Sequence, residues 1–392
     1  MRHKEDHASF PMIDVLRGFA ATFVVVYHVM HYFPLPGAPA GGPRWVQYGW
    51  TGVDLFFVIS GFVISLSAFR GIDRLGSTGF RMDFARQRLA RIAPLYYLTG
   101  FIFAVTLVPA LFFETNAWMN WLAHALFAHN LFPKFHGSID GANWSVGTEM
   151  QFYLLILLAA PWLRSAKSIT IVIIFIAISW AWRLTSYFYF APEVSPASFG
   201  MFFFQTQLPG MLDEFAIGIL VAKLIRSPSD SASQHLAMGA LLLAVSIVGI
   251  AAVTLAANPL VHYLFFRTFL ASGFGALLLL ACHLSGTILM AASLPFRYIG
   301  KISYGIYLWH LVVLVPMMQF KWLTADRALP VILGSTALLA AVSWHFFERP
   351  FLMRYGRRSY QTEPLTEPKT DPLSDERELP SPGLGFKAPA AN

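Results

Sequence analysis

The stretch IDVLRGFAATFVVVYHVMHYF, residues 13–33, decides the fold class, because it is apolar and long enough to cross a bilayer as one helix. It nevertheless contains Arg17 and, eleven positions later, His28. A charged side chain at mid-bilayer costs about 2.5–3.5 kcal/mol, so such residues serve a function or are neutralised by partners. Eleven residues are close to three helical turns, which places both side chains on one side, ~16 Å apart along the axis. This layout suits a long ligand with a charged head and a reactive tip.

The composition supports the same fold class over the whole chain. Hydrophobic residues make up 56% of the 392 residues and charged residues only 12%, with a mean hydropathy of +0.56. Soluble domains carry about a quarter charged residues. The sequence therefore predicts an all-α polytopic membrane protein. The net charge of +7 does not indicate nucleic-acid binding, because most Lys and Arg residues lie in short loops between apolar segments.

The apolar segments predict about ten transmembrane helices and their orientation. They are residues 10–33, 50–69, 92–114, 142–163, 168–190, 203–225, 235–257, 263–290, 300–320 and 328–348. The segment 118–132 is too short to cross and is expected to be re-entrant or interfacial. Lys and Arg concentrate in every second loop, so the positive-inside rule places both termini in the cytoplasm. Residues 1–350 are expected to form the membrane domain, and the Pro-rich residues 351–392 a disordered cytoplasmic tail.

Polar residues recur at two depths. Toward the outer side, Asp54 lies in the second predicted span, and Ser145 and Glu149 share a face of the fourth because they are four residues apart. Glu149 and His28 then lie at similar depths on different helices. A carboxylate that orients an imidazole is the usual arrangement of a general base, although the sequence alone does not bring the two helices together.

On the cytoplasmic side, six arginines fall between residues 70 and 91. Arg88 and Arg91 are three apart in a helical setting and so share one face, and guanidinium groups bind phosphate bidentately. With Asp14 and Arg17 they would form a polar mouth for an anionic cytosolic ligand. Positive-inside bias alone also explains these arginines, and Asp14 is well placed to pair with Arg17.

Other polar residues have structural explanations as well. His28 and His31 are spaced to bind a metal ion, but no third ligand is evident. His310, in GKISYGIYLWH, falls mid-membrane and suits a site or a structural role equally. Glu348, in FFERP, has Arg349 beside it, which makes a local ion pair the simplest interpretation.

At these residues the chain resembles the membrane acyltransferase 3 family, the integral membrane O-acyltransferases of bacterial surface and secreted carbohydrates. The resemblance covers about residues 10–350, and Gln87 stands where many members have a further arginine. The matching elements, in chain order, are Arg-x10-His at Arg17 and His28, GVDLFFVISGFVIS, RLARIAPLYYL with Arg88, Arg91, Pro94 and Tyr96, NWSVGTEMQFYLL with Trp144, Ser145, Glu149, Phe152 and Tyr153, SYGIYLWH with His310, and the closing FFERP.

The resemblance implies a multi-pass enzyme of the bacterial inner membrane that moves an acyl group, most commonly acetyl, from cytosolic acyl-CoA to a carbohydrate hydroxyl. Acyl-CoA is then a co-substrate, and neither a cofactor nor a metal is expected. The acceptor is an exopolysaccharide, an O-antigen or a glycolipid. The implied residues are the catalytic His28, Glu149 and Arg17, the acyl-CoA-binding Arg88, Arg91 and Tyr96, and the acceptor or supporting Asp14, Asp54, Trp144, Ser145, Tyr153 and His310.

Three questions stay open at this point. The acyl group passes either directly to the acceptor, with His28 as general base and Glu149 in support, or through a transient acyl-enzyme on His28 or Ser145. Some family members carry a fused extracytoplasmic domain, so the acceptor is acylated directly or through a separate partner. A transporter or flippase for a lipid-linked sugar is the alternative function, because ten spans with intramembrane Arg, His and Glu would suit it. The oligomeric state is not indicated.

Overall fold

The computed structural model describes residues 10–34, 42–194, 196–227, 231–284, 292–320 and 323–355, and the regular structure in these ranges is helical. The helices are α1 (Pro11–Tyr32), α2 (Arg44–Gln47), α3 (Thr51–Leu107), α4 (Ala117–Ala125), α5 (Trp144–Ser165), α6 (Ser168–Thr185), α7 (Ala197–Gln205), α8 (Leu208–Arg226), α9 (Ala232–Ala256), α10 (Pro259–His283), α12 (Leu294–Lys301), α13 (Ser303–Met317), α14 (Ala325–Ser343) and α15 (Arg349–Tyr355). Short turns of 3₁₀ or π-helix lie at 109–112, 129–131, 186–190, 191–193 and 344–348.

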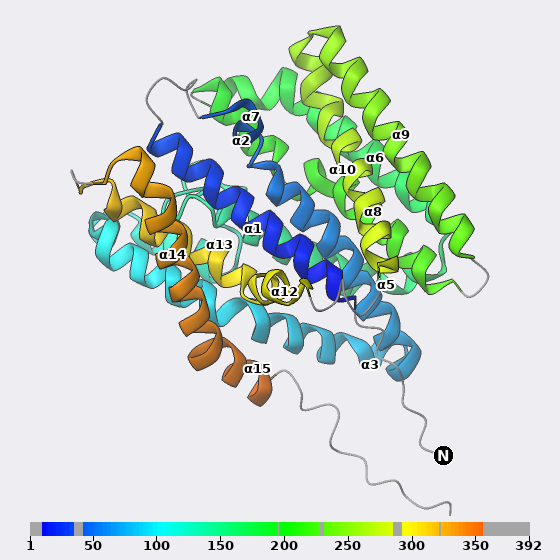
Figure 1. Cartoon of the computed structure of the whole chain (residues 1–392), viewed down its shortest axis with the longest axis horizontal. Coiled ribbons are helices and arrows are strands. Elements are labelled where there is room, and N and C mark those ends of the chain that lie inside the picture. The colour runs from blue at the N-terminus through cyan, green and yellow to red at the C-terminus, as the bar shows by residue number, and fades with distance from the viewer. Residues whose placement is uncertain are drawn as a thin grey trace, which may run out of the picture.

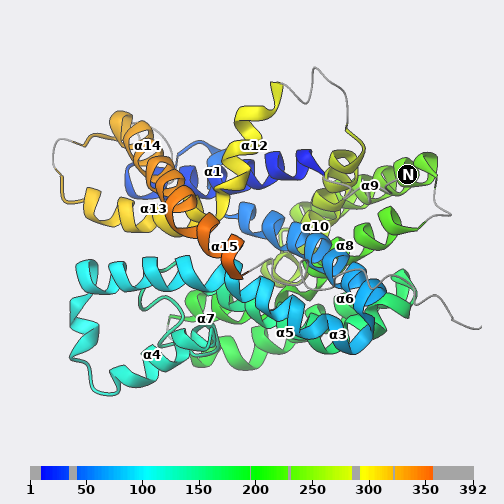
Figure 2. The same ribbon diagram turned by 90° about the horizontal axis from the view of Figure 1, so that it is seen from below.

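Helix α1 lies between two groups of helices (Figure 1). On one side α9 packs along α10, and α8 packs against α3 and α6. On the other side α13 packs against α14, while α12 lies across α1. Figure 2 shows α3 extended along the molecule, with α4 at one end of it. Since α1 contacts both α3 and α13, residues along it can face the interior at several depths.

The predicted all-helical membrane architecture is confirmed, but the count of ten spans is not. Within the described residues, seven helices are long and apolar enough to cross a membrane, or eight if the bent pair α12–α13 is one span. The predicted spans 50–69 and 92–114 both lie in α3, which is 57 residues long. The predicted span 203–225 is divided between α7 and α8, and α8 carries four charged residues.

A kink divides α3. Gly76 has φ 75° and ψ 172°, a left-handed backbone conformation that glycine adopts without steric cost. The pattern of two apolar segments with a charged stretch between them was correct, but the charged stretch is helical rather than a loop. It therefore presents its arginines at helical spacing.

Two predicted segments outside the long helices can be compared with the structure. The segment 118–132 contains α4 and a 3₁₀ turn, and the nine residues of α4 are too short to cross a bilayer, as expected. At the other end of the chain, α15 continues to Tyr355, so residues 351–355 of the predicted tail are helical. Residues 356–392 lie outside the described ranges.

A buried ion pair holds three helices together beside the long helix α3. Arg183 of α6 and Asp213 of α8 are both fully buried, with 2.9 Å between Nη2 and Oδ1. The Arg183 guanidinium also donates to the carbonyls of Gly210 and Leu264, and Thr268 of α10 donates to Asp213 at 2.5 Å. With its donors satisfied, this arginine stabilises the fold rather than offering a binding site.

Among the glycines that the structure describes, Gly300 of α12 lies in the tightest helix contact. A Cβ atom there would be 1.7 Å from the carbonyl oxygen of Asp14 in α1. We expect Gly300→Ala to lower the free energy of unfolding by about 3 kcal/mol, because the two backbones must separate. The matched control is Gly334→Ala in α14, where a Cβ meets nothing within 4 Å and alanine favours the helix. Thermal unfolding in detergent measures both, and equal melting temperatures would contradict the close-approach argument.

Candidate active site

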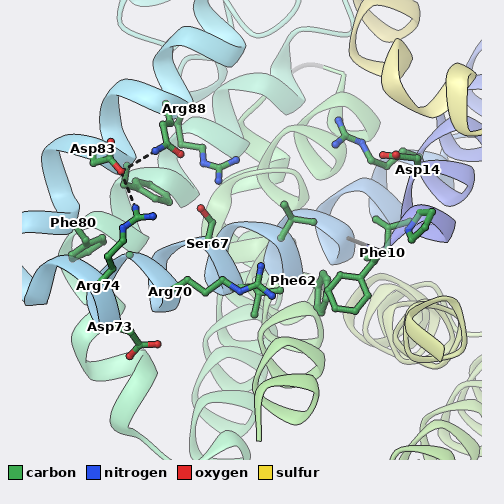
Figure 3. Close-up of a pocket in the computed structure, with 18 of the residues that line it drawn as sticks. Phe10, Asp14, Phe62, Ser67, Arg70, Asp73, Arg74, Phe80, Asp83 and Arg88 are labelled. Atoms are coloured by element: carbon green, nitrogen blue, oxygen red, sulfur yellow. Dashed lines mark hydrogen bonds and ion pairs between the residues drawn. The ribbon is translucent and has the colours of Figure 1, made fainter. Parts of the chain in front are cut away.

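The first part of the site is a large cavity, about 960 Å³, between the start of α1 and the charged middle of α3. We call it the basic cavity, because six basic side chains in its wall outnumber three acidic ones. Figure 3 shows Asp14 on one side of this cavity and Arg74, Asp83 and Arg88 on the other. The charged residues of the wall are Arg17, Arg70, Arg74, Arg88, Arg297, Lys301, Asp14, Asp73 and Asp83.

The acidic residues of the basic cavity are largely engaged, whereas several arginines are not. Asp73 pairs with Arg164 at 2.6 Å and with Arg226, and Asp83 accepts from Gln87 at 2.8 Å. Among the described residues, no hydrogen-bond partner reaches the buried Nε atoms of Arg17, Arg88 and Arg297. Buried donors without partners are costly, so this wall is suited to an anionic ligand rich in acceptor oxygens.

The second part is a narrow cavity of about 100 Å³, lined by Arg17, Arg88, Arg91 and Glu149 among others. Glu149 accepts hydrogen bonds there from the hydroxyls of Ser60, at 2.6 Å, and Tyr153, at 2.7 Å. Arg17, Arg88 and Arg91 therefore meet at one place, as the sequence predicted. Glu149 lies with these arginines, and its carboxylate is bonded to the two hydroxyls rather than to His28.

Arg91 has an acidic partner from the far end of the chain. Its Nη1 lies 3.7 Å from Oε2 of Glu348, and its guanidinium lies over the rings of Trp344 at 5.0 Å and Tyr304 at 5.8 Å. Glu348 thus pairs with Arg91 and not with the adjacent Arg349, which corrects the local ion pair expected from FFERP. The turn that places it, 344–348, is π-helical, a geometry frequent at functional sites.

The third part is a cavity of about 600 Å³ that we call the aromatic cavity. His28 lies in its wall and donates through Nδ1 to the carbonyl of Val24 at 3.0 Å. Because a carbonyl only accepts, the neutral ring carries its proton on Nδ1 and keeps a lone pair on Nε2. The aromatic residues of the wall are Tyr27, Trp50, Trp144, Tyr187, Phe202, Tyr263, Phe266 and Tyr307.

His310 and Ser145 contact residues of the wall of this third cavity without lining it themselves. The His310 ring is fully buried, 5.0 Å from the ring of His28 between centroids, and its Nδ1 donates to the Tyr307 carbonyl at 2.5 Å. Ser145 lines the narrow cavity, with its hydroxyl 2.7 Å from that of Tyr307 and 3.2 Å from the Ala142 carbonyl. Neither the Tyr307 hydroxyl nor the Ala142 carbonyl is a general base, so these contacts do not activate Ser145 as a nucleophile.

Two further predicted site residues, Tyr96 and Asp54, also line none of the three cavities. The Tyr96 hydroxyl is 3.2 Å from Nδ1 of His129, whose Nε2 donates to the Asn143 carbonyl, and Tyr96 lines none of the three cavities. Asp54 is fully buried and pairs with Arg267 instead of facing a cavity. Trp144, in contrast, lines the aromatic cavity.

The three cavities share walls. Arg17, Val63 and Arg88 line both the basic and the narrow cavity, and Val53 and Tyr307 line both the narrow and the aromatic cavity. Helix α1 runs past all three, with Asp14 in the first, Arg17 in the first two and His28 in the last. The cavities are therefore neighbours in one series that leads from a basic chamber to an imidazole.

Comparison with known proteins decides the family. A model described as an acyltransferase domain matches residues 10–347. The chain belongs to this acyltransferase family. The resemblance seen in the sequence motifs is thereby confirmed, and the matched residues contain every motif except the end of FFERP, since Glu348, Arg349 and Pro350 lie beyond residue 347.

Relatives of this chain include proteins of three bacteria. "Putative peptidoglycan O-acetyltransferase YrhL" of Bacillus subtilis is 26% identical over 386 residues, covering 92% of this chain and 57% of the relative. "O-acetyltransferase OatA" of Staphylococcus aureus is 25% identical over 376 residues, covering 87% and 57%. "Peptidoglycan O-acetyltransferase OatA" of Listeria monocytogenes is 24% identical over 369 residues, covering 87% and 55%. The chain thus spans a little over half the length of these relatives. No solved structure matches it.

The sequence reasoning missed Arg267, which lines the aromatic cavity of the acyltransferase. The signal was available, because FFRTF places an arginine inside an apolar segment, the same feature that singled out Arg17. Ser60 and Tyr307 were also missed. Their hydroxyls carry no comparable sequence signal, since such residues are common in membrane helices and gain a role only from their neighbours.

Asp140 gives the acyltransferase a testable pH dependence. Its Oδ1 accepts from the Ala142 amide at 2.9 Å, and Oδ2 is buried with no partner in the described ranges. Burial raises the pKa of Asp140 from 3.8 to about 7. The native state therefore holds a proton that the unfolded chain releases between about pH 4 and pH 7, and stability falls as the pH rises through that window. We expect the melting temperature of the wild-type protein to fall more between about pH 5 and pH 8 than the melting temperature of Asp140→Asn. An equal fall in the two proteins would contradict this prediction.

Proposed function

We propose that this acyltransferase moves an acyl group, most often acetyl, from a coenzyme A thioester to a hydroxyl of a carbohydrate. The observation that supports the proposal is the series of cavities along α1. It joins a basic chamber with unpartnered arginine donors to a histidine with a free Nε2 lone pair. A donor with a polyphosphate head, a long thin arm and a reactive end matches such a series in charge and in shape.

The donor would occupy the first two cavities. Its phosphates would be bound by Arg17, Arg88 and Arg297, whose Nε atoms have no partner among the described residues. The extended arm would then pass through the narrow cavity beside Glu149. The ~16 Å that helical rise gives between Arg17 and His28 is the length such an arm has to cover.

The acceptor would enter the aromatic cavity, where His28 acts as general base. Nε2 takes the proton of the acceptor hydroxyl as its oxygen attacks the thioester carbonyl carbon. The carbon–sulfur bond then breaks, and the departing sulfur takes the proton from His28 to leave as a thiol. The buried His310 ring beside His28 and the aromatic wall would keep water from hydrolysing the thioester. Glu149 would serve by positioning the arginines of the narrow cavity rather than by supporting His28 directly.

The relatives and the distribution of charge support a proposal for the acceptor class and for the location. We propose a bacterial cell-surface or secreted carbohydrate, which includes the peptidoglycan named for the relatives as well as exopolysaccharide, O-antigen and glycolipid. The basic cavity would open toward the cytoplasm, where the positive-inside rule places both termini of an inner-membrane protein.

Acetyl transfer is measured directly on the purified protein in lipid nanodiscs. Isotope-labelled acetyl-CoA is supplied with peptidoglycan fragments or with surface glycans of the source cell. We expect release of the CoA thiol and label on the glycan by mass spectrometry. Movement of a lipid-linked sugar across the membrane without thioester cleavage would contradict the proposal and favour a flippase.

A further inference from the structure

Arg267 of α10 is a buried cation at the wall of the aromatic cavity, and no step proposed above uses it. Its side chain is 6% exposed. Nη1 pairs with the carboxylate of Asp54 in α3 and lies 3.7 Å from Oε1 of Glu214 in α8. Its guanidinium lies over the ring of Trp50 at 4.7 Å. Three helices therefore hold this group in one position at the cavity wall.

The pairing through Nη1 leaves the opposite edge of the guanidinium open. Nε is buried, and the described residues supply hydrogen-bond partners neither to Nε nor to Nη2. The Nε–H and Nη2–H bonds of a guanidinium point in the same direction and form a fork of two parallel donors. A buried donor without an acceptor is costly, so the fork is suited to a ligand oxygen.

The charges around Arg267 decide which kind of oxygen fits. Asp54 and Glu214 are fully buried, and neither lines the aromatic cavity. Asp54 already balances the charge of Arg267, so an anion at the fork would add negative charge near two carboxyl groups at low dielectric. A cationic amine would be repelled by the guanidinium itself. A neutral carbonyl oxygen accepts from both donors and leaves the charge balance unchanged.

The rest of the cavity wall suits a short acyl group. Met201, Tyr263 and Phe266 line the same cavity and offer apolar surface to a methyl group. Gln205 also lines it, and its Nε2 donates to the Tyr263 carbonyl at 2.9 Å, which fixes the amide. A planar amide carbonyl with a small apolar end matches both the fork and this wall.

We propose that Arg267 selects acceptor sugars that carry an N-acyl group, by donating Nε–H and Nη2–H to the amide carbonyl. This inference rests on the proposed function, because it requires the carbohydrate acceptor to occupy the aromatic cavity. His28 acts on the reacting hydroxyl, and Arg267 determines which sugar presents it.

A matched pair of probes tests the selection by binding alone. The β-1,4-linked tetramers of N-acetylglucosamine and of glucose share linkage and length, and differ in an acetamido group against a hydroxyl. Calorimetric titration of the purified protein in nanodiscs gives both dissociation constants. We expect the N-acetylated tetramer to bind on the order of 10-fold more tightly, the contribution of a hydrogen bond to a charged group. Equal binding, or no binding of either probe, would overturn the proposal.

Two buried arginines allow a matched pair of variants. Arg267→Lys keeps a cation for Asp54 but removes the fork, and we expect the two tetramers to bind it about equally. Arg183→Lys alters the other buried Arg–Asp pair, which lines none of the three cavities, and is expected to keep the preference despite a lower melting temperature. If Arg267→Lys does not fold, the double variant Asp54→Asn with Arg267→Gln removes both charges together.

The outcomes separate the two proposals. A preference that persists in the Arg267 variants would overturn the selection by Arg267, even if the protein cleaves acetyl-CoA. Thiol release from acetyl-CoA, measured on the same preparations, tests the proposed function independently. A wild-type preference for the N-acetylated tetramer without any thioester cleavage would support the binding site and contradict the acyl transfer.

Discussion

Replacing His28 with alanine is expected to lower kcat for acyl transfer by about 10²- to 10⁴-fold, the usual contribution of a general base. The ring already has Nδ1 engaged with the Val24 carbonyl, so Nε2 is the atom available to take the hydroxyl proton. The side chain lines a cavity and forms no ion pair with the residues that the structure describes, so its removal leaves none of their charges unpaired. Michaelis constants for acetyl-CoA should change little, because the basic cavity lies toward the other end of α1.

The control for this variant is three residues further along the same helix. His31 is exposed and lines none of the three cavities, so His31→Ala should transfer acetyl at close to the wild-type rate. Turnover is measured as thiol release, normalised to the amount of folded protein in the membrane. Wild-type turnover in a well-expressed His28→Ala protein would remove His28 from the mechanism.

The second large effect is expected at Arg88, which lines both the basic and the narrow cavity. Arg88→Gln should raise the Michaelis constant for acetyl-CoA on the order of 10- to 100-fold, since one charge-assisted contact to phosphate is lost. The effect on kcat should be small, because Arg88 is remote from the thioester in the proposed arrangement. Arg91→Gln should act more weakly, since Glu348 already balances the charge of Arg91.

Arg81 provides the control for Arg88. It lies on the same helix, is exposed, and lines none of the three cavities, so Arg81→Gln changes the net charge equally without touching the site. Initial rates over a range of acetyl-CoA concentrations give the two constants for each variant. An effect of Arg88→Gln confined to the acceptor, or an equal effect of Arg81→Gln, would contradict phosphate binding by Arg88.

Local sequence patterns predicted the helical elements well because hydrophobic length and periodicity are local properties. The expected span 10–33 is α1, and the three-residue spacing of Arg88 and Arg91 does place both at the narrow cavity. The count of ten spans is not confirmed, and one reason is that α3 carries two of the predicted apolar segments in one helix. A count that assumes a loop between apolar segments has no means of detecting a continuous helix with a kink at Gly76.

For the candidate site as well, the sequence predicted relations within one helix but not contacts between helices. Arg17 and His28 could be related from sequence, because a single helix fixes the offset between them. Glu149 was placed beside His28 on depth alone, whereas the structure bonds it to Ser60, 89 residues away in the chain. The pairing of Arg91 with Glu348 likewise depends on how α3 meets the last helices, which helical spacing does not encode. A hydropathy pattern predicts the depth of a residue in the membrane, but it does not predict which residues of other helices lie beside it.

The narrow cavity has a volume of about 100 Å³ and lies between cavities of about 960 and 600 Å³. Its small size matters for the permeability of the membrane around the proposed reaction. A continuous wide channel would let ions and metabolites leak between compartments. A short constriction walled by fixed charges of both signs admits a slender arm and little else. Under the proposed function, group transfer through it would need no alternation between inward-open and outward-open forms, whereas a carrier would need one.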